Sequence, residues 1–244
     1  MKRFKTIHTS RTMMFAELEK VMAYSLDSEN FLEALGDNIT AKKSNSGVEK
    51  TASYLKQLYG FDNNEHTFVA FKYFWKNSES SEQPLIAFLY AVNKDYLLSE
   101  SIEVIQGTAS GEKAAIESFE NVIEKYHPQR YSANTLKSVA QNIASSWKQA
   151  GFILGKVKNI RIQPDITYRI ATFAFLLAYL SGDRGEYIWN NRCVNALCLP
   201  ESKLRELAIE GAKNDLMQYQ HAGSVTAISF TALLNKIGID GNTN

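Results

Sequence analysis

The spacing of apolar residues predicts a mainly helical chain. Apolar side chains recur every three or four positions through most of the sequence, which is the period of an amphipathic helix. The longest example runs from Tyr131 to Gly151, where Ser132 can cap the start and the glycine can cap the end. The other helices are expected from residue 11, around residues 31–35, and over 48–59, 68–75, 85–92, 112–126, 166–180 and 204–211.

The hydrophobic period changes to two directly after Gly151. Val157 and Ile160 alternate there with basic residues, which is the pattern of a strand that is buried on one side only. The pattern predicts a short basic hairpin that closes near Lys158 and Asn159. A helix followed by such a hairpin is the layout of a winged helix.

The same order of elements returns near the C-terminus. The helix around residues 204–211 is followed by two strand-like runs, 216–221 and 225–230, which meet at residues 222–224. The expected fold class is a mainly α helical bundle with helix-turn-helix and winged-helix-like units and two short β-hairpins. Four regions are expected: a helix-turn-helix-like unit (1–62), a helical packing region (63–128), a basic winged-helix-like unit (129–182) and a C-terminal helix plus hairpin that forms a second winged-helix-like unit (183–244).

Charge is distributed unevenly along the chain. The 244 residues carry a net charge of +1, but residues 130–169 hold seven basic side chains and one acid, Asp165, which gives a net charge of +6. Residues 63–129 hold five basic and ten acidic side chains, which argues against contact with nucleic acid there. A polyanion would therefore meet one local basic patch rather than a uniformly basic surface.

The helix over 131–151 dominates the basic patch. Its expected outer face carries donors and small polar groups without an acid, whereas an ordinary solvated helix mixes both signs. This face comprises Lys137, Ser138, Gln141, Asn142, Ser145, Ser146, Lys148 and Gln149.

Together with the hairpin, this face predicts binding to double-stranded DNA. About five to seven phosphate contacts would give a log–log salt slope of about −5 to −6. The alternative is a helical scaffold whose basic face docks an acidic protein partner. RNA is a weaker option, because the chain lacks the aromatic stacking pattern of single-strand recognition. The candidate nucleic-acid-binding residues are Lys42, Lys43, Arg130, Lys137, Asn142, Ser145, Lys148, Lys156, Lys158 and Arg161.

Two further basic segments lie in the first region. The N-terminal arm holds no acid before Glu17, and such an arm can contact phosphates or be a frayed, solvated terminus. Lys42 and Lys43 precede the third helix, where helix-turn-helix proteins contact phosphates, although a plain helical corner would use the same turn residues. The basic residues of the arm are Lys2, Arg3, Lys5, His8 and Arg11.

The residues show no catalytic, metal-binding or cofactor-binding pattern. Gly107 and Gly111 suggest a phosphate loop, but three residues separate them instead of four, and Glu112 would oppose a phosphate. Cys193 and Cys198 lack the second ligand pair of a zinc site and are expected to be structural thiols. The four histidines are scattered and show no pairing with a nucleophile. We therefore expect no enzyme activity, no metal, no cofactor and no small-molecule substrate.

The chain shows no signal for a membrane or for secretion. Its longest apolar run, residues 170–180, is eleven residues long, whereas a membrane-spanning helix needs about 20. The first eleven residues are basic but lack the apolar core of a secretory signal. A cytoplasmic protein without a membrane partner is expected.

Several short segments resemble one bacterial family. They are residues 11–18, the pair Asp37 and Asn38 ahead of a polar turn, residues 145–147, the pair Ala150 and Gly151, and Tyr179, Leu180 and Gly182. Together they are similar to the BrxA family of small proteins encoded in BREX phage-defence operons. The resemblance implies a bacterial, cytoplasmic, non-enzymatic accessory protein that binds DNA through helix-turn-helix and winged-helix elements. It also implies work beside other proteins of the operon, namely a methyltransferase, an ATPase and a phosphatase-like protein.

Overall fold

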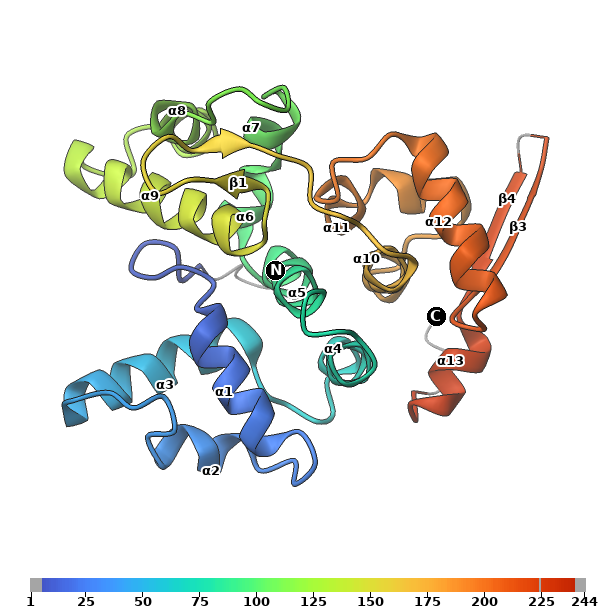
Figure 1. Ribbon diagram of the computed structural model, residues 1–244, viewed down its shortest axis with the longest axis horizontal. Coiled ribbons are helices and arrows are strands. Elements are labelled where there is room, and N and C mark those ends of the chain that lie inside the picture. The colour runs from blue at the N-terminus through green and yellow to red at the C-terminus, as the bar shows by residue number, and fades with distance from the viewer. Residues whose placement is uncertain (1–5, 224, 240–244) are drawn as a thin grey trace.

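The computed structural model describes residues 6–223 and 225–239, which form a mainly helical protein with two short antiparallel hairpins (Figure 1). The expected mainly α fold with two hairpins is therefore confirmed. One continuous apolar core joins the helices of all regions. The predictions for Lys2, Arg3, Lys5 and Ser224 lie outside the described residues.

The first three helices form the N-terminal unit and match the three helices expected in this region. The first begins later than residue 11 because Met14 adopts a left-handed backbone with φ of 56°, which a right-handed helix excludes. The third begins at Asn45 because the Ser44 hydroxyl accepts a hydrogen bond from the Gly47 N–H at 3.1 Å, as an N-cap does. The bounds are Phe15–Ser25 for α1, Phe31–Gly36 for α2 and Asn45–Tyr59 for α3.

Two helices, α4 (His66–Lys76) and α5 (Gln83–Lys94), form the middle of the molecule, and Figure 1 shows both nearly end-on between the other units. Every residue from 85 to 92 is buried, so α5 packs against its neighbours on all sides. The Tyr90 ring packs against the Phe71 ring at a tilt of 37°, with ring centroids 4.7 Å apart. The aromatic residues expected to serve packing therefore fill the core.

The central winged unit comprises four helices and a hairpin. Its last helix, α9, is capped by Ser132 as expected and is followed by Gly151 at a positive φ of 86°. The boundary expected near Pro128 falls between two helices, α8 and α9, that pack against each other. Two short helices, α6 and α7, were not expected from the sequence. The bounds are Tyr96–Glu100 for α6, Ile102–Gln106 for α7, Ile116–Tyr126 for α8, Ala133–Gln149 for α9, Ile153–Leu154 for β1 and Ile160–Arg161 for β2.

A strand-like segment before α8 completes the winged helix. Lys113 pairs with Ile160 in an antiparallel bridge, and the Gly111 N–H donates to the Arg161 carbonyl at 2.8 Å. This pairing explains why α8 begins at Ile116 rather than at Glu112. The order of helix, strand-like segment, two helices and hairpin is that of a winged helix.

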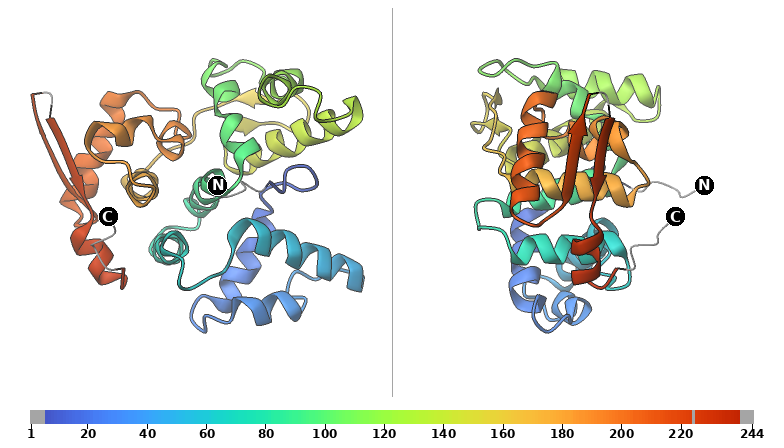
Figure 2. Two further views of the ribbon diagram at one scale, coloured as in Figure 1. Left: turned by 180° about the vertical axis from the view of Figure 1, so that it is seen from behind. Right: turned by 90° about the vertical axis from the view of Figure 1, so that its right-hand side faces the viewer.

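The C-terminal winged unit also ends its helices with a hairpin, which has longer strands, and it has a 3-10 helix where the central unit has its strand-like segment. β3 and β4 pair antiparallel from Gln218↔Ser229 to Ala222↔Val225, and Figure 2 shows the hairpin lying alongside α12. The apolar helix α10, expected over 166–180, packs on α11 and α12 as well as on α4 and α5. The bounds are Tyr168–Leu180 for α10, Gly185–Asn190 for the 3-10 helix η1, Arg192–Asn195 for α11, Glu201–Lys213 for α12, Gln218–Ala222 for β3, Val225–Ser229 for β4 and Thr231–Lys236 for α13.

No helix in the described part of the chain has the length and apolar character needed to cross a membrane. The most apolar helix, α10, has 13 residues.

Candidate nucleic-acid interface

The helix α9 presents one side to the core and one side to solvent. On the core side, Trp147 packs against Phe88 and Phe152 with ring centroids 4.5 and 5.0 Å away, and its indole N–H donates to Ser101 Oγ at 2.7 Å. These contacts fix the rotation of the helix about its axis. The side that faces solvent is therefore also fixed.

The solvent side of α9 carries an acid-free polar stripe, which we name the outer stripe. Lys137, Ser138 and Gln141 in it are exposed, and Ser145 and Lys148 are half-buried. The 3.6-residue period of the helix places these five on one face. Hydroxyl, amide and ammonium groups in such a row are the donors that contact phosphates and base edges.

The wing, residues 155–159, continues the outer stripe. Lys148 Nζ donates to the Lys156 carbonyl at 3.3 Å and to Asn159 Oδ1 at 3.0 Å, which ties the wing to α9. Lys156 and Lys158 are exposed, and Val157 between them is 81% exposed. The wing thus presents two lysines and one aliphatic side chain to solvent.

Arg161 does not belong to this surface, and its expected place on the outside of the hairpin is wrong. The side chain is only 5% exposed and lies over the Phe152 ring at 5.3 Å. Its guanidinium donates to the carbonyl of Ile162 and to Gln163 Oε1. The inward and outward faces of β2 are the reverse of the expected ones, because Arg161 is buried and donates to the Ile105 carbonyl of α7, whereas Ile160 is half-buried. Burial lowers the pKa of Arg161, against an opposing effect of Cys198.

Three residues of the expected outer face contact the N-terminal arm or the first residue of α1 instead. The Asn142 side-chain amide donates to the His8 carbonyl at 2.9 Å, and Gln149 Oε1 accepts from the Phe15 N–H at 3.0 Å. Ser146 is fully buried. The prediction that Asn142 faces solvent with the outer stripe is therefore wrong, because the arm, residues 6–14, covers this side of α9.

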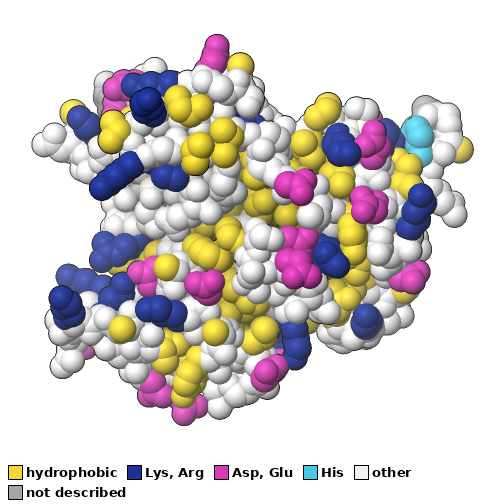
Figure 3. All heavy atoms as spheres, in the orientation of Figure 1, with side chains coloured by type: hydrophobic (Ala, Val, Ile, Leu, Met, Phe, Trp, Pro, Cys, Tyr) yellow, Lys and Arg dark blue, Asp and Glu magenta, His cyan; other side chains and the backbone are white. Residues whose placement is uncertain are grey.

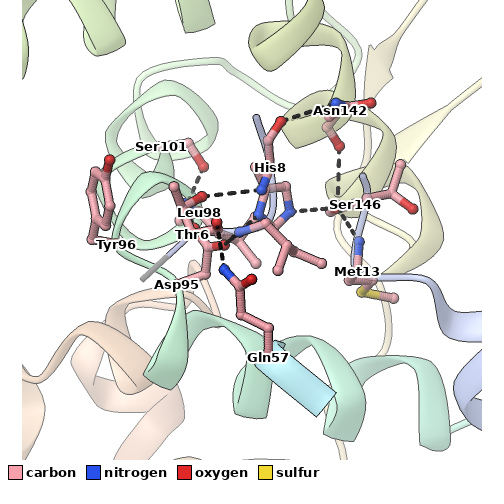
Figure 4. A network of polar contacts seen from close by, with 12 residues as sticks. Thr6, His8, Met13, Gln57, Asp95, Tyr96, Leu98, Ser101, Asn142 and Ser146 are labelled. Carbon is pink, nitrogen blue, oxygen red and sulfur yellow. Dashed lines mark hydrogen bonds and ion pairs between the residues drawn. The ribbon is translucent and has the colours of Figure 1, made fainter. Parts of the chain in front are cut away.

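The contact between arm and helix contains a chain of three buried polar side chains (Figure 4). His8 Nδ1 lies 2.9 Å from Asp95 Oδ2, and His8 Nε2 lies 2.9 Å from Ser146 Oγ. The sequence does not indicate these partners of His8, because Asp95 and Ser146 are far from it in the chain. A serine, a histidine and an aspartate in this order can form a hydrolytic triad, but all three are fully buried and out of reach of a substrate carbonyl.

The buried aspartate is held in its ionised form. Burial alone would raise the pKa of Asp95, but the imidazole of His8 and the N–H groups of Ile7 and Leu98 outweigh it and lower the pKa below its ordinary value. Ile7 and His8 are both buried, so this part of the arm is not a frayed, solvated terminus.

The remaining candidate residues surround the outer stripe. Lys42 forms an ion pair with Glu17 at 2.7 Å, whereas Lys43 is exposed. Arg130 is exposed and lies over the rings of Tyr96 and Tyr131, 5.8 and 5.6 Å from their centroids.

A groove of ≈ 380 Å³ lies between the arm, α3 and α9. Lys42 and Thr51 line it on the side of the N-terminal unit, and Asn142 lines it from α9. The arm contributes Ser10 and Arg11. The groove therefore lies where the N-terminal unit meets α9, and its charged lining residues are Arg11, Lys42 and Glu17.

The exposed lysines of the basic surface have no carboxylate partner in the part of the chain that the structure describes. Within residues 6–223 and 225–239, none of Lys43, Lys137, Lys156 and Lys158 forms an ion pair. Figure 3 shows Lys and Arg side chains along the left margin, over α3, the arm and α9, whereas both signs alternate over the C-terminal unit. Paired bases on other faces include Lys72 with Glu29, Lys76 with Asp27, Lys125 with Glu103 and Lys203 with Glu206.

Of the two cysteines, which are both free thiols, Cys193 is buried and Cys198 is half-buried. Burial raises the pKa of Cys193 to about 12 and that of Cys198 to about 11. Both thiols therefore stay protonated at neutral pH, which makes them poor metal ligands. The described residues hold no group of three or more His, Cys, Asp and Glu side chains that could bind a metal ion.

Comparison of the chain with protein-family models, with curated proteins and with solved structures found no significant match.

Proposed function

We propose that the protein binds double-stranded DNA through the central winged unit, mainly by phosphate contacts. The observation that carries this proposal is the continuity of the acid-free outer stripe of α9 with a wing whose two lysines form no ion pair. Unpaired ammonium groups on a rigid surface attract a polyanion and release its counterions on contact.

The number of cations on this surface determines the expected salt dependence of binding. With Arg161 buried, the cations of the central unit that can reach a duplex are Lys137, Lys148, Lys156 and Lys158, together with Arg130. Four or five phosphate contacts predict a log–log salt slope of about −4. The magnitude of this slope is smaller than that of the slope of about −5 to −6 expected from the sequence alone.

The biological role follows from the resemblance to the BrxA family. The protein would be a non-enzymatic, cytoplasmic accessory of a BREX-like bacterial phage-defence system. It would bring other proteins of the same operon to DNA or act beside them there.

Fluorescence anisotropy with labelled nucleic acids tests the proposal. Duplex DNA, duplex RNA and single-stranded DNA of equal length would each be titrated over a salt series. We expect the tightest binding for duplex DNA, with a slope of about −4. Absence of duplex binding at low salt, or a slope near zero, contradicts the proposal.

A helical scaffold that docks an acidic protein partner is the second candidate. It is favoured by two aliphatic side chains on the hairpin, Leu154 and Val157, which are 60% and 81% exposed. Exposed apolar groups beside lysines suit a protein interface. Under this alternative, changing Leu154 and Val157 to Ser would abolish docking of the acidic partner, and the anisotropy series would show no tight duplex binding.

A further inference from the structure

The hydroxyl of Ser146 fixes both ends of a short loop in the arm. Its oxygen lies 2.9 Å from His8 Nε2 and accepts a hydrogen bond from the Met13 N–H at 2.8 Å. Between these two anchors, the Arg11 N–H donates to the Ile7 carbonyl at 2.8 Å. The loop is therefore closed internally and is attached to α9 at two points.

Further buried contacts join this loop to the rest of the molecule. Asp95, at the start of α6, accepts from the Ile7 N–H at 2.8 Å and contacts His8 Nδ1. On the opposite side, the Tyr59 hydroxyl of α3 donates to the Met13 carbonyl at 2.7 Å. The loop thus acts as a brace between the N-terminal unit and the central winged unit.

Arg11 is exposed and, together with Glu17, lines the groove between the arm, α3 and α9. The guanidinium lies 5.1 Å from the centroid of the Tyr54 ring on α3 and donates to the Ser10 carbonyl at 2.9 Å. Arg11 forms no ion pair with any described acid, and the nearby Glu17 is already paired with Lys42 at 2.7 Å. The guanidinium is therefore oriented by an aromatic ring and available to an external anion.

We propose that Arg11 binds a backbone phosphate of duplex DNA in this groove, and that Ser146 and His8 are positioning residues that hold it there. The inference rests on the proposed function and extends it, because the duplex would then lie across both the N-terminal unit and the central winged unit. A guanidinium suits this task, since its planar donors match two phosphate oxygens.

Replacement of Arg11 by Ala tests the contact directly. In the anisotropy salt series, R11A lowers duplex affinity about tenfold at low salt and reduces the magnitude of the slope by about 0.9. The matched control is R184A, because Arg184 also lies over a tyrosine ring, Tyr179, at 3.7 Å, and also donates to a backbone carbonyl. Arg184 belongs to the C-terminal unit, so R184A leaves affinity and slope unchanged.

A double-mutant comparison tests the positioning role. Ser146→Ala removes the shared anchor while keeping a good helix former. S146A reduces the magnitude of the salt slope as R11A does. The loss of duplex affinity in the R11A/S146A double variant is no larger than the greater of the two losses in the single variants. A merely structural role would lower the unfolding temperature but leave the two binding effects additive. If circular dichroism shows S146A to be unfolded, N142A takes its place, because it removes only the hydrogen bond to the His8 carbonyl.

The outcomes separate this inference from the proposed function. If wild-type protein binds duplex DNA and R11A has the wild-type slope, or if the double variant is additive, only this inference is overturned. If wild-type protein shows no salt-dependent duplex binding, both are overturned.

Discussion

The central and C-terminal winged units both place a hairpin after a long helix, but one basic residue of that helix has different partners in the two units. In the C-terminal unit, Arg205 on α12 is bound by the carboxylates of Glu186 at 2.8 Å and Glu201 at 2.6 Å. In the central unit, Lys148 near the end of α9 links this helix to the wing, and its partners are two uncharged oxygens of the wing. Arg205 is thus neutralised by two carboxylates, whereas Lys148 has no carboxylate partner.

This difference separates the role of the fold from the role of the charge. A winged helix positions a helix face and a wing side by side, whatever residues they carry. A cation that is already paired with carboxylates contributes little attraction for a polyanion. We therefore expect the proposed DNA binding at the central unit, where Lys137, Lys156 and Lys158 are exposed and form no ion pair with any described acid.

The largest expected effect comes from reversing charge in one unit at a time. Changing Lys137, Lys156 and Lys158 to Glu lowers duplex affinity at low salt by at least about 100-fold, because three phosphate contacts become repulsive. Changing Arg184, Lys203 and Lys213 to Glu alters the net charge by the same amount but lowers affinity less than about threefold. Fluorescence anisotropy measures both. Equal losses in the two variants would refute a localised surface.

A charge graft sharpens the comparison. The graft starts from the variant in which Lys137, Lys156 and Lys158 are changed to Glu. Adding Glu206→Lys and Glu210→Lys would give the exposed face of α12 the positive charge that α9 normally carries. If the two units differ mainly in charge, the graft restores duplex affinity by about tenfold at low salt. No recovery in the same anisotropy assay would mean that the shape of the C-terminal unit is unsuited to a duplex.

Replacement of Arg205 is expected to lower the stability of the protein more than replacement of Lys148. Arg205→Ala removes hydrogen bonds to Glu186, Thr226 and Tyr219 from a mostly buried guanidinium. We expect a loss of about 1–2 kcal/mol in the free energy of unfolding. Lys148→Ala is expected to cost less than about 1 kcal/mol. Urea denaturation measures both values, and a larger loss for Lys148→Ala would contradict this ranking.

The smallest effect concerns pH and the buried contact between the arm and the central unit. The pKa of Asp95 in the folded protein lies below its ordinary value of 3.8. A lowered pKa contributes stability above the unfolded-state value, and that contribution is lost as the pH falls through the folded-state value. Wild-type protein should therefore lose stability below pH about 4, and Asp95→Asn should flatten this part of the profile. Denaturation at a series of acidic pH values tests it, and parallel profiles would contradict it.

Much of the fold could be predicted because most helices carry a clear apolar period. The helix α9 and its Ser132 cap were predicted almost to the residue, since cap and period agree. The short helices α6 and α7 were missed, because five residues are too few to show a period. The hairpin at 153–161 was predicted, but its strands are only two residues long, so alternation could not fix which face is inside.

Only part of the candidate site could be predicted from the sequence. Sequence periodicity shows which side of α9 is apolar, but it does not show what covers the polar side. Asn142 and Ser146 were assigned to solvent because nothing in their neighbourhood reveals the arm, which comes from more than 130 residues away. Arg161 was assigned to the wing surface because its buried partners are mostly backbone carbonyls, which leave no trace in a sequence.

Hydrogen–deuterium exchange with and without duplex DNA tests the central claim most directly. At low salt and saturating duplex, we expect slower exchange over residues 133–161, and unchanged exchange over α12 and the β3–β4 hairpin. Protection of the C-terminal winged unit, or no protection in either unit, would contradict the account.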